Sequence, residues 1–148
     1  MVIERGRPKA YRPLPDADRR AAFAAGLAAY DRGDWFLAHE LLEPAWMGTA
    51  DPAERTLDSG LIKLAAAGVH ASRGNPGGVR KNLIGARLRL ASLVEPSDDP
   101  ALARFQADRR SPAAGIDLLA LVASIDARLA AEADRPTDAD PPPIPRRA

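Results

Sequence analysis

A series of helix start and stop signals constrains the fold of this chain more than any other feature. Asp51-Pro52-Ala53-Glu54 combines an N-cap carboxylate, a proline at the first helical position and a glutamate three residues after the cap. Gly74-Asn75-Pro76 ends one helix and begins the next, and Gly33-Asp34 does the same earlier. These signals predict helices over about residues 16–32, 35–46, 52–72 and 76–93.

Apolar residues between these signals recur at the three- and four-residue spacing of an amphipathic helix. The clearest stripe is Val79, Leu83, Ala86, Leu90 and Leu93. Asp99-Pro100 predicts a short helix through Phe105, and Asp117 caps a last helix with its own apolar stripe. No stretch reads as a credible strand.

Two helix–helix junctions are similar to each other, which indicates stacked helical hairpins. One contains Arg32-Gly33-Asp34 and the other Arg73-Gly74-Asn75. This is the pattern of tetratricopeptide-type repeats, although two copies are too few for a solenoid. The predicted fold is therefore all-α, a compact bundle of two helical hairpins, TPR-like, plus a C-terminal helix.

Proline placement divides the 148 residues into three parts. Residues 1–15 are predicted to form an extended basic, proline-containing arm, because prolines break helices and the arginines keep the arm solvated. Residues 16–134 form a single helical domain, long enough for a hydrophobic core. Residues 135–148 carry five prolines and are predicted to be a disordered or polyproline-like tail.

Composition excludes several classes of protein. The chain has no cysteine, which rules out disulfides and thiolate metal sites. Its net charge of +1 provides no global field for nucleic acid or membranes. No segment resembles a signal peptide or a membrane span, so we expect a cytoplasmic protein without a membrane partner.

The stretch from Trp35 to Trp46 concentrates the chemistry of the chain. On a helical wheel, His39 and Glu43 lie in the middle of the aromatic stripe, and Glu40 lies on its edge. The stripe itself consists of Trp35, Phe36 and Trp46. If it faces the core, the ionisable groups need partners, because an unpaired buried charge costs several kcal/mol.

The next predicted helix offers such partners. Lys63 and His70 lie on one face of it, opposite the main apolar face. Antiparallel packing of the two helices would bring Lys63 and His70 toward His39 and Glu43. Pro44 removes one helical hydrogen bond and is expected to bend or end its helix.

The motifs in these two segments resemble the signature of domain-of-unknown-function family 309. The first is Gly33-Asp34-Trp35-Phe36-Leu37-Ala38-His39-Glu40-Leu41-Leu42-Glu43 with Trp46, and the second is Gly60-Leu61-Ile62-Lys63 with His70 and Arg73-Gly74-Asn75. The resemblance covers about residues 20–94. It implies a small all-helical fold with no established activity. This chain departs from the usual pattern at Lys63, where family members usually carry Gln, and at Pro44.

Three functional interpretations follow from these residues. The leading one is a non-catalytic helical module that binds a protein or a small ligand, organised by a His/Glu polar cluster: His39, Glu40, Glu43, Lys63 and His70, with Trp35, Phe36 and Trp46 as aromatic lining. The second is a metal-assisted hydrolase or related enzyme that uses Glu40 with His39, Glu43 and His70. A carboxylate would activate water and the histidines would hold a divalent metal or shuttle protons, with His39, Glu43 and His70 as the metal ligands. The structural alternative to both is a buried polar network between the two helices, with the aromatic residues in the core.

The third interpretation is a nucleic-acid-binding accessory domain. Arg80 and Arg87 lie seven residues apart on one helix face, where they could contact phosphates. The near-zero net charge and the lack of interleaved aromatics favour a solvated face instead. The small, alanine-rich helix faces would also allow two copies of the chain to pack as a homodimer.

Overall fold

The computed structural model describes residues 2–4 and 6–147 of the chain. Its helices are α1 (Asp16–Asp31), α2 (Trp35–Met47), α3 (Pro52–Ser72), α4 (Pro76–Ser92), α5 (Pro100–Ala107), the 3₁₀ helix η1 (Pro112–Gly115) and α6 (Leu118–Ala131). The predicted all-α bundle is confirmed. Likeness to tetratricopeptide repeats stays a prediction. No helix in the described part of the chain has the length and apolar character needed to cross a membrane.

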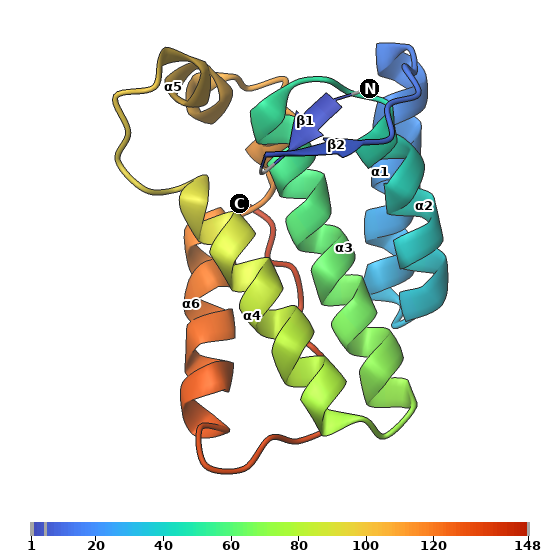
Figure 1. Ribbon diagram of the computed structural model, residues 1–148, viewed down its shortest axis with the longest axis vertical. Helices are drawn as coiled ribbons and strands as arrows, with labels where there is room; N and C mark the ends of the chain where they lie inside the picture. Colours follow the sequence, from blue (N-terminus) through green and yellow to red (C-terminus); the bar gives the residue numbers. More distant parts are fainter. Residues whose placement is uncertain (1, 5, 148) are drawn as a thin grey trace.

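The helices pack in a row with α3 near its middle (Figure 1). The hairpin of α1 and α2 lies on one side of α3, and α4 lies on the other. The last long helix, α6, packs against α4. This arrangement leaves one face of α2, α3 and α4 open to the segment that precedes α1.

That segment contains a small β-hairpin, which the sequence analysis did not predict. β1 (Val2–Glu4) pairs antiparallel with β2 (Arg7–Lys9), with Ile3 opposite Pro8. Gly6 has a φ of +73°, a conformation that glycine adopts readily and that allows the tight turn. The expectation of no strand is therefore wrong here. The hairpin lies across the upper part of the helices (Figure 1).

The helix boundaries follow the capping residues. The side chains of Asp34, Asp51, Asn75, Asp99 and Asp117 each accept a hydrogen bond from a backbone N–H in the first turn that follows. Gly33 and Gly74 have positive φ at the two junctions. Pro44 does not end α2, which continues to Met47.

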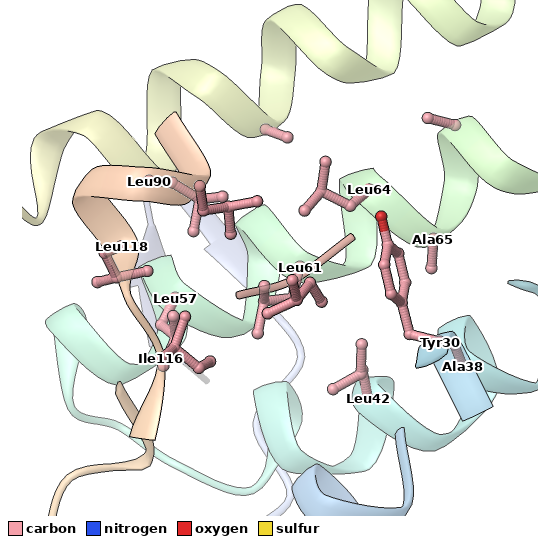
Figure 2. Close-up of a cluster of buried hydrophobic side chains, with 14 of the residues drawn as sticks. Tyr30, Ala38, Leu42, Leu57, Leu61, Leu64, Ala65, Leu90, Ile116 and Leu118 are labelled. Atoms are coloured by element: carbon pink, nitrogen blue, oxygen red, sulfur yellow. The ribbon is translucent and has the colours of Figure 1, made fainter. Parts of the chain in front are cut away.

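The core is a layer of aliphatic side chains centred on α3 (Figure 2). Leu57, Leu61 and Leu64 of α3 are fully buried, as are Leu42 of α2 and Leu90 of α4. Gly60 and Gly68 allow the helices to approach, because a Cβ would lie 2.7 Å from Leu90 and 2.3 Å from Trp35, respectively. The small residues of α3 therefore serve close packing.

The proline-rich tail is packed against the bundle. It returns from the end of α6 to its beginning, where the amide of Asp117 donates to the carbonyl of Pro145 at 3.0 Å. The hydroxyl of Tyr30 donates to the carbonyl of Pro142 at 2.7 Å, and Ile144 is buried. The expectation of a disordered tail differs from this structure. Ile144 and the backbone carbonyls between the prolines provide contacts that composition does not reveal.

Candidate functional site

The cluster of His39, Glu40 and Glu43 lies at the surface of α2. Nδ1 of His39 is 3.8 Å from Oε1 of Glu40 and 3.8 Å from Oε1 of Glu43. The three side chains are 30%, 53% and 43% exposed, respectively. They face solvent in part, which differs from the buried network considered from the sequence. Among the described residues, they form a group whose possible ligand atoms all lie within 4.8 Å of one another.

The three aromatic residues of α2 lie in different environments. Trp35 packs edge-on against Tyr30, with ring centroids 4.9 Å apart, and covers Gly68 of α3. Phe36 is 63% exposed. Trp46 is half-buried near the C-terminal end of α2. Trp35 is therefore a packing residue, and Trp46 is the one that lines a cavity.

His70 is held at the junction of α3 and α4. Its Nδ1 lies 3.1 Å from Nδ2 of Asn75. A Cβ on Gly78 would lie only 2.3 Å from the same nitrogen, so the ring packs directly on the first turn of α4. His70 is absent from the potential metal group found within residues 2–4 and 6–147. The geometry therefore indicates a structural role for His70 in this turn.

A cavity of about 490 Å³ lies between part of the β-hairpin and the helices. Its lining comes from five elements and consists of Glu4, Arg7, Lys9, Trp46, Ser59, Lys63 and Arg89. Four of these seven side chains are cationic, and one is acidic. The structure therefore joins Lys63 with Trp46 in one site, instead of with His70.

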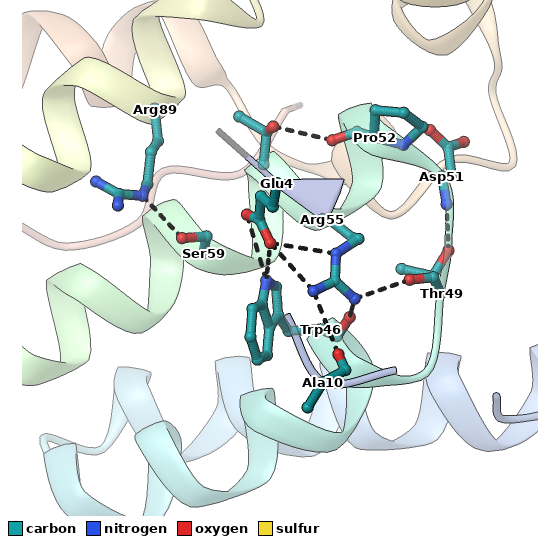
Figure 3. A network of polar contacts seen from close by, with 10 residues as sticks. Glu4, Ala10, Trp46, Thr49, Asp51, Pro52, Arg55, Ser59 and Arg89 are labelled. Atoms are coloured by element: carbon teal, nitrogen blue, oxygen red, sulfur yellow. Dashed lines mark hydrogen bonds and ion pairs between the residues drawn. The ribbon is translucent and has the colours of Figure 1, made fainter. Parts of the chain in front are cut away.

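The single acid of this cavity, Glu4, is already bound by the protein (Figure 3). Its carboxylate accepts hydrogen bonds from Nε1 of Trp46 at 3.1 Å and from Nε and Nη2 of Arg55 at 3.2 and 3.1 Å. The charge of Arg55 neutralises that of Glu4. The cavity is therefore lined by four cationic side chains and by one acid that is already paired with Arg55.

Arg55 is the centre of this buried network. It is only 1% exposed, and its guanidinium also donates to the carbonyl oxygens of Trp46 at 2.8 Å and Thr49 at 3.1 Å. The guanidinium carbon lies 4.4 Å from the centre of the Trp46 ring, which is a cation–π contact. Arg55 therefore fixes both the indole and the end of α2.

Arg89 is positioned on the opposite wall. Its Nε donates to Oγ of Ser59 at 2.8 Å, and its Nη1 donates to the carbonyl of Gly85 at 2.9 Å. The stem of Lys63 packs beside Gly85, where a Cβ would lie 3.5 Å from its Cδ. Glycine at this position leaves room for the lysine between α3 and α4.

One family model matches a segment that contains part of this site. Residues 23–82 match the family model described as "Domain of unknown function (DUF309)". This segment is therefore similar to DUF309 domains. The match confirms the resemblance found in the sequence. Searches of curated proteins and of solved structures gave no match.

The DUF309 match contains only part of the cavity. Trp46, Ser59 and Lys63 lie within it. The remaining lining residues, Glu4, Arg7, Lys9 and Arg89, lie outside it. The cationic character of the cavity therefore depends on residues on both sides of the DUF309 segment.

The arginines considered for nucleic acid both contact α6 or its end. Nη1 of Arg80 donates to the carbonyl of Glu132 at 3.3 Å, and Arg87 forms an ion pair with Asp126. These intramolecular contacts give both arginines a role in fastening α6 to α4. They weaken the interpretation that this face binds phosphates.

Sequence reasoning missed most of the cavity. Arg7 and Lys9 were interpreted only as solvating charges, and Glu4, Ser59, Arg55 and Arg89 were not singled out. The one available signal was Arg55, which directly follows a strong helix start and precedes a buried apolar face. Its partner Glu4 lies 51 residues away, so no local pattern connects them.

Proposed function

We propose that this domain is a binding module for a small organic anion, most suitably a phosphorylated one. The observation that carries the proposal is the gathering of Arg7, Lys9, Lys63 and Arg89 around one cavity. Among the described lining residues the one acid is Glu4, and it is paired with Arg55. This deepens the binding-module interpretation of the sequence. The proposed binding site is the cavity beside the hairpin, in place of the His39 cluster.

The chemistry of the lining fits a phosphate. Arginine and lysine donate charge-assisted hydrogen bonds to phosphate oxygens, and arginine can do so in bidentate geometry. A volume of about 490 Å³ falls in the range of roughly 300–1,000 Å³ that is common for small-molecule sites. Trp46 supplies an apolar surface beside the cations, which suits an organic group attached to the phosphate.

Binding of inorganic pyrophosphate and ADP tests this proposal. Isothermal titration at low salt should show binding of both, and adenosine should bind much more weakly because it lacks the charge. Lys63→Gln and Arg89→Gln should each weaken pyrophosphate binding by about tenfold, equivalent to about 1.4 kcal/mol. Affinity should also fall as salt increases.

Lys81→Gln provides a matched control. Lys81 is an exposed lysine of α4 that does not line the cavity, so this variant should bind pyrophosphate within about twofold of the wild type. The proposal fails if the wild type binds neither anion. It also fails if Lys63→Gln and Lys81→Gln bind equally well.

A second candidate function is divalent-metal binding by His39, Glu40 and Glu43. A tetrahedral ion with ligands at about 2.1 Å places them about 3.4 Å apart, close to the two 3.8 Å separations here. In this group Glu40 is the third candidate metal ligand, instead of the His70 expected from the sequence. Zinc should raise the melting temperature of the wild type and leave that of His39→Asn unchanged; equal shifts would remove this candidate.

A further inference from the structure

We infer that the β1–β2 hairpin is a movable wall of the anion cavity, and that Glu4 is the residue that positions it. This inference rests on the proposed anion site. Binding of the anion and docking of the hairpin would then stabilise each other. The segment before α1 becomes part of the binding machinery.

The hairpin provides a large part of the cavity lining. Glu4, Arg7 and Lys9 are three of its seven lining residues. Arg7 and Lys9 are two of its four cations. The other two cations, Lys63 and Arg89, belong to α3 and α4. An anion in the cavity would therefore bridge the hairpin and the helical bundle.

The hairpin has little intrinsic stability. Each strand has three residues, and an isolated two-stranded hairpin is marginally stable at best in water. Ile3, the central residue of β1, is exposed. Apolar burial of Ile3 therefore does not hold the strands on the helices.

Polar contacts with α2 and α3 hold the hairpin in place (Figure 3). The carboxylate of Glu4 receives three hydrogen bonds from Trp46 and Arg55 at 3.1–3.2 Å. After β2, the amide of Arg12 donates to the carbonyl of Met47 at 2.8 Å, and Nη2 of Arg55 donates to the carbonyl of Ala10 at 3.4 Å. Glu4 is thus the side chain that fastens β1 itself.

Loss of Glu4 should release β1 without unfolding the bundle. Arg55 would keep its hydrogen bonds to the carbonyls of Trp46 and Thr49. Arg7 and Lys9 would lose their fixed position opposite Lys63 and Arg89. Because coupling between two events is reciprocal, an anion that binds better to the docked state must also favour docking.

The test combines pyrophosphate titration with amide hydrogen exchange on the full chain. In the wild type, pyrophosphate should slow exchange in β1 and β2. In Glu4→Ala, these amides should exchange at least tenfold faster without the anion, and pyrophosphate affinity should fall about tenfold. Exchange in the centre of α3 should remain much slower than exchange in the hairpin, which reports that the bundle is folded. Glu4→Gln, which keeps an acceptor and loses the charge, should give intermediate values.

Glu95→Gln is the control, because it removes an exposed carboxylate beyond the end of α4. It should match the wild type in both measurements. The inference is overturned if Glu4→Ala binds pyrophosphate as tightly as the wild type. It is also overturned if pyrophosphate binds the wild type without slowing hairpin exchange. A wild type that binds no pyrophosphate would instead refute the anion site itself.

Discussion

Two polar clusters involve α2, and they differ in origin and surroundings. The first, His39 with Glu40 and Glu43, comes from a little more than one helical turn and is partly exposed. The second joins Glu4 of β1, Trp46 of α2 and Arg55 of α3, and its arginine is buried. The density of ionisable residues along the sequence points to the first cluster, while the structure gives the second the greater role in holding elements together.

The physical reason lies in solvation. Exposed charges interact through water and contribute little, whereas a buried guanidinium depends on every acceptor around it. Arg55 has acceptors on the hairpin, on α2 and in the loop before α3. Substitutions in the two clusters should therefore differ greatly in their effect on stability.

The largest effect is expected for Arg55→Met. This change removes the partner of Glu4 and the donor to three carbonyl oxygens, while it keeps most of the apolar stem. Breaking a buried pair in this way costs about 3–5 kcal/mol. Urea denaturation monitored by circular dichroism would measure it, with the exposed Arg20→Met as control. A loss below about 1 kcal/mol would mean that the buried network is dispensable.

A smaller effect of opposite sign is expected for Asp58→Asn. Asp58 is 1% exposed, and neither carboxyl oxygen has a hydrogen-bond partner in the described residues. Burial raises the pKa of Asp58 well above its usual value, because the charged form loses its solvation. Its contribution is therefore fully present below about pH 4, the unfolded pKa, and decreases as pH rises toward the folded pKa.

Asp58→Asn should accordingly stabilise the protein at pH 7 and have a smaller effect near pH 4. Denaturation at several pH values would show the difference, with the exposed Asp98→Asn as reference. A pH-independent difference between Asp58→Asn and the wild type would contradict the burial of an ionisable carboxyl.

The smallest effect is expected in the exposed cluster. Without added metal, His39→Asn and Glu43→Gln should each change stability by less than about 0.5 kcal/mol, because exposed ion pairs contribute little. Thermal melts of both variants beside the wild type would check this. A loss of several kcal/mol would revive the interpretation of a structural network and erase the contrast between the two clusters.

The fold was largely predictable because its signals are local. Asp51-Pro52 and Asn75-Pro76 carry their structural meaning in adjacent residues, and the helices begin where they indicate. The hairpin and the packed tail were not predictable in this way. Glu4 and Arg55 are 51 residues apart, and Tyr30 and Pro142 are 112 apart.

The candidate site shows the same division. Trp46 and Lys63 were found from their helix faces, and both line the cavity. Arg7, Lys9 and Arg89 were not found as site residues, because only tertiary packing brings their charges together. The prolines of the tail exclude helices and central strands, but their carbonyl oxygens still accept hydrogen bonds from Asp117 and Tyr30.

The contact between Tyr30 and Pro142 bears on how the protein assembles during synthesis. At roughly 5–20 residues per second, a ribosome needs about 6–22 s to add the 112 residues that separate them. Throughout that interval, the surface of α1 that the tail covers stays open to the cell. The contact that fastens the tail to α1 is therefore among the last to form, because residues 141–147 must emerge first.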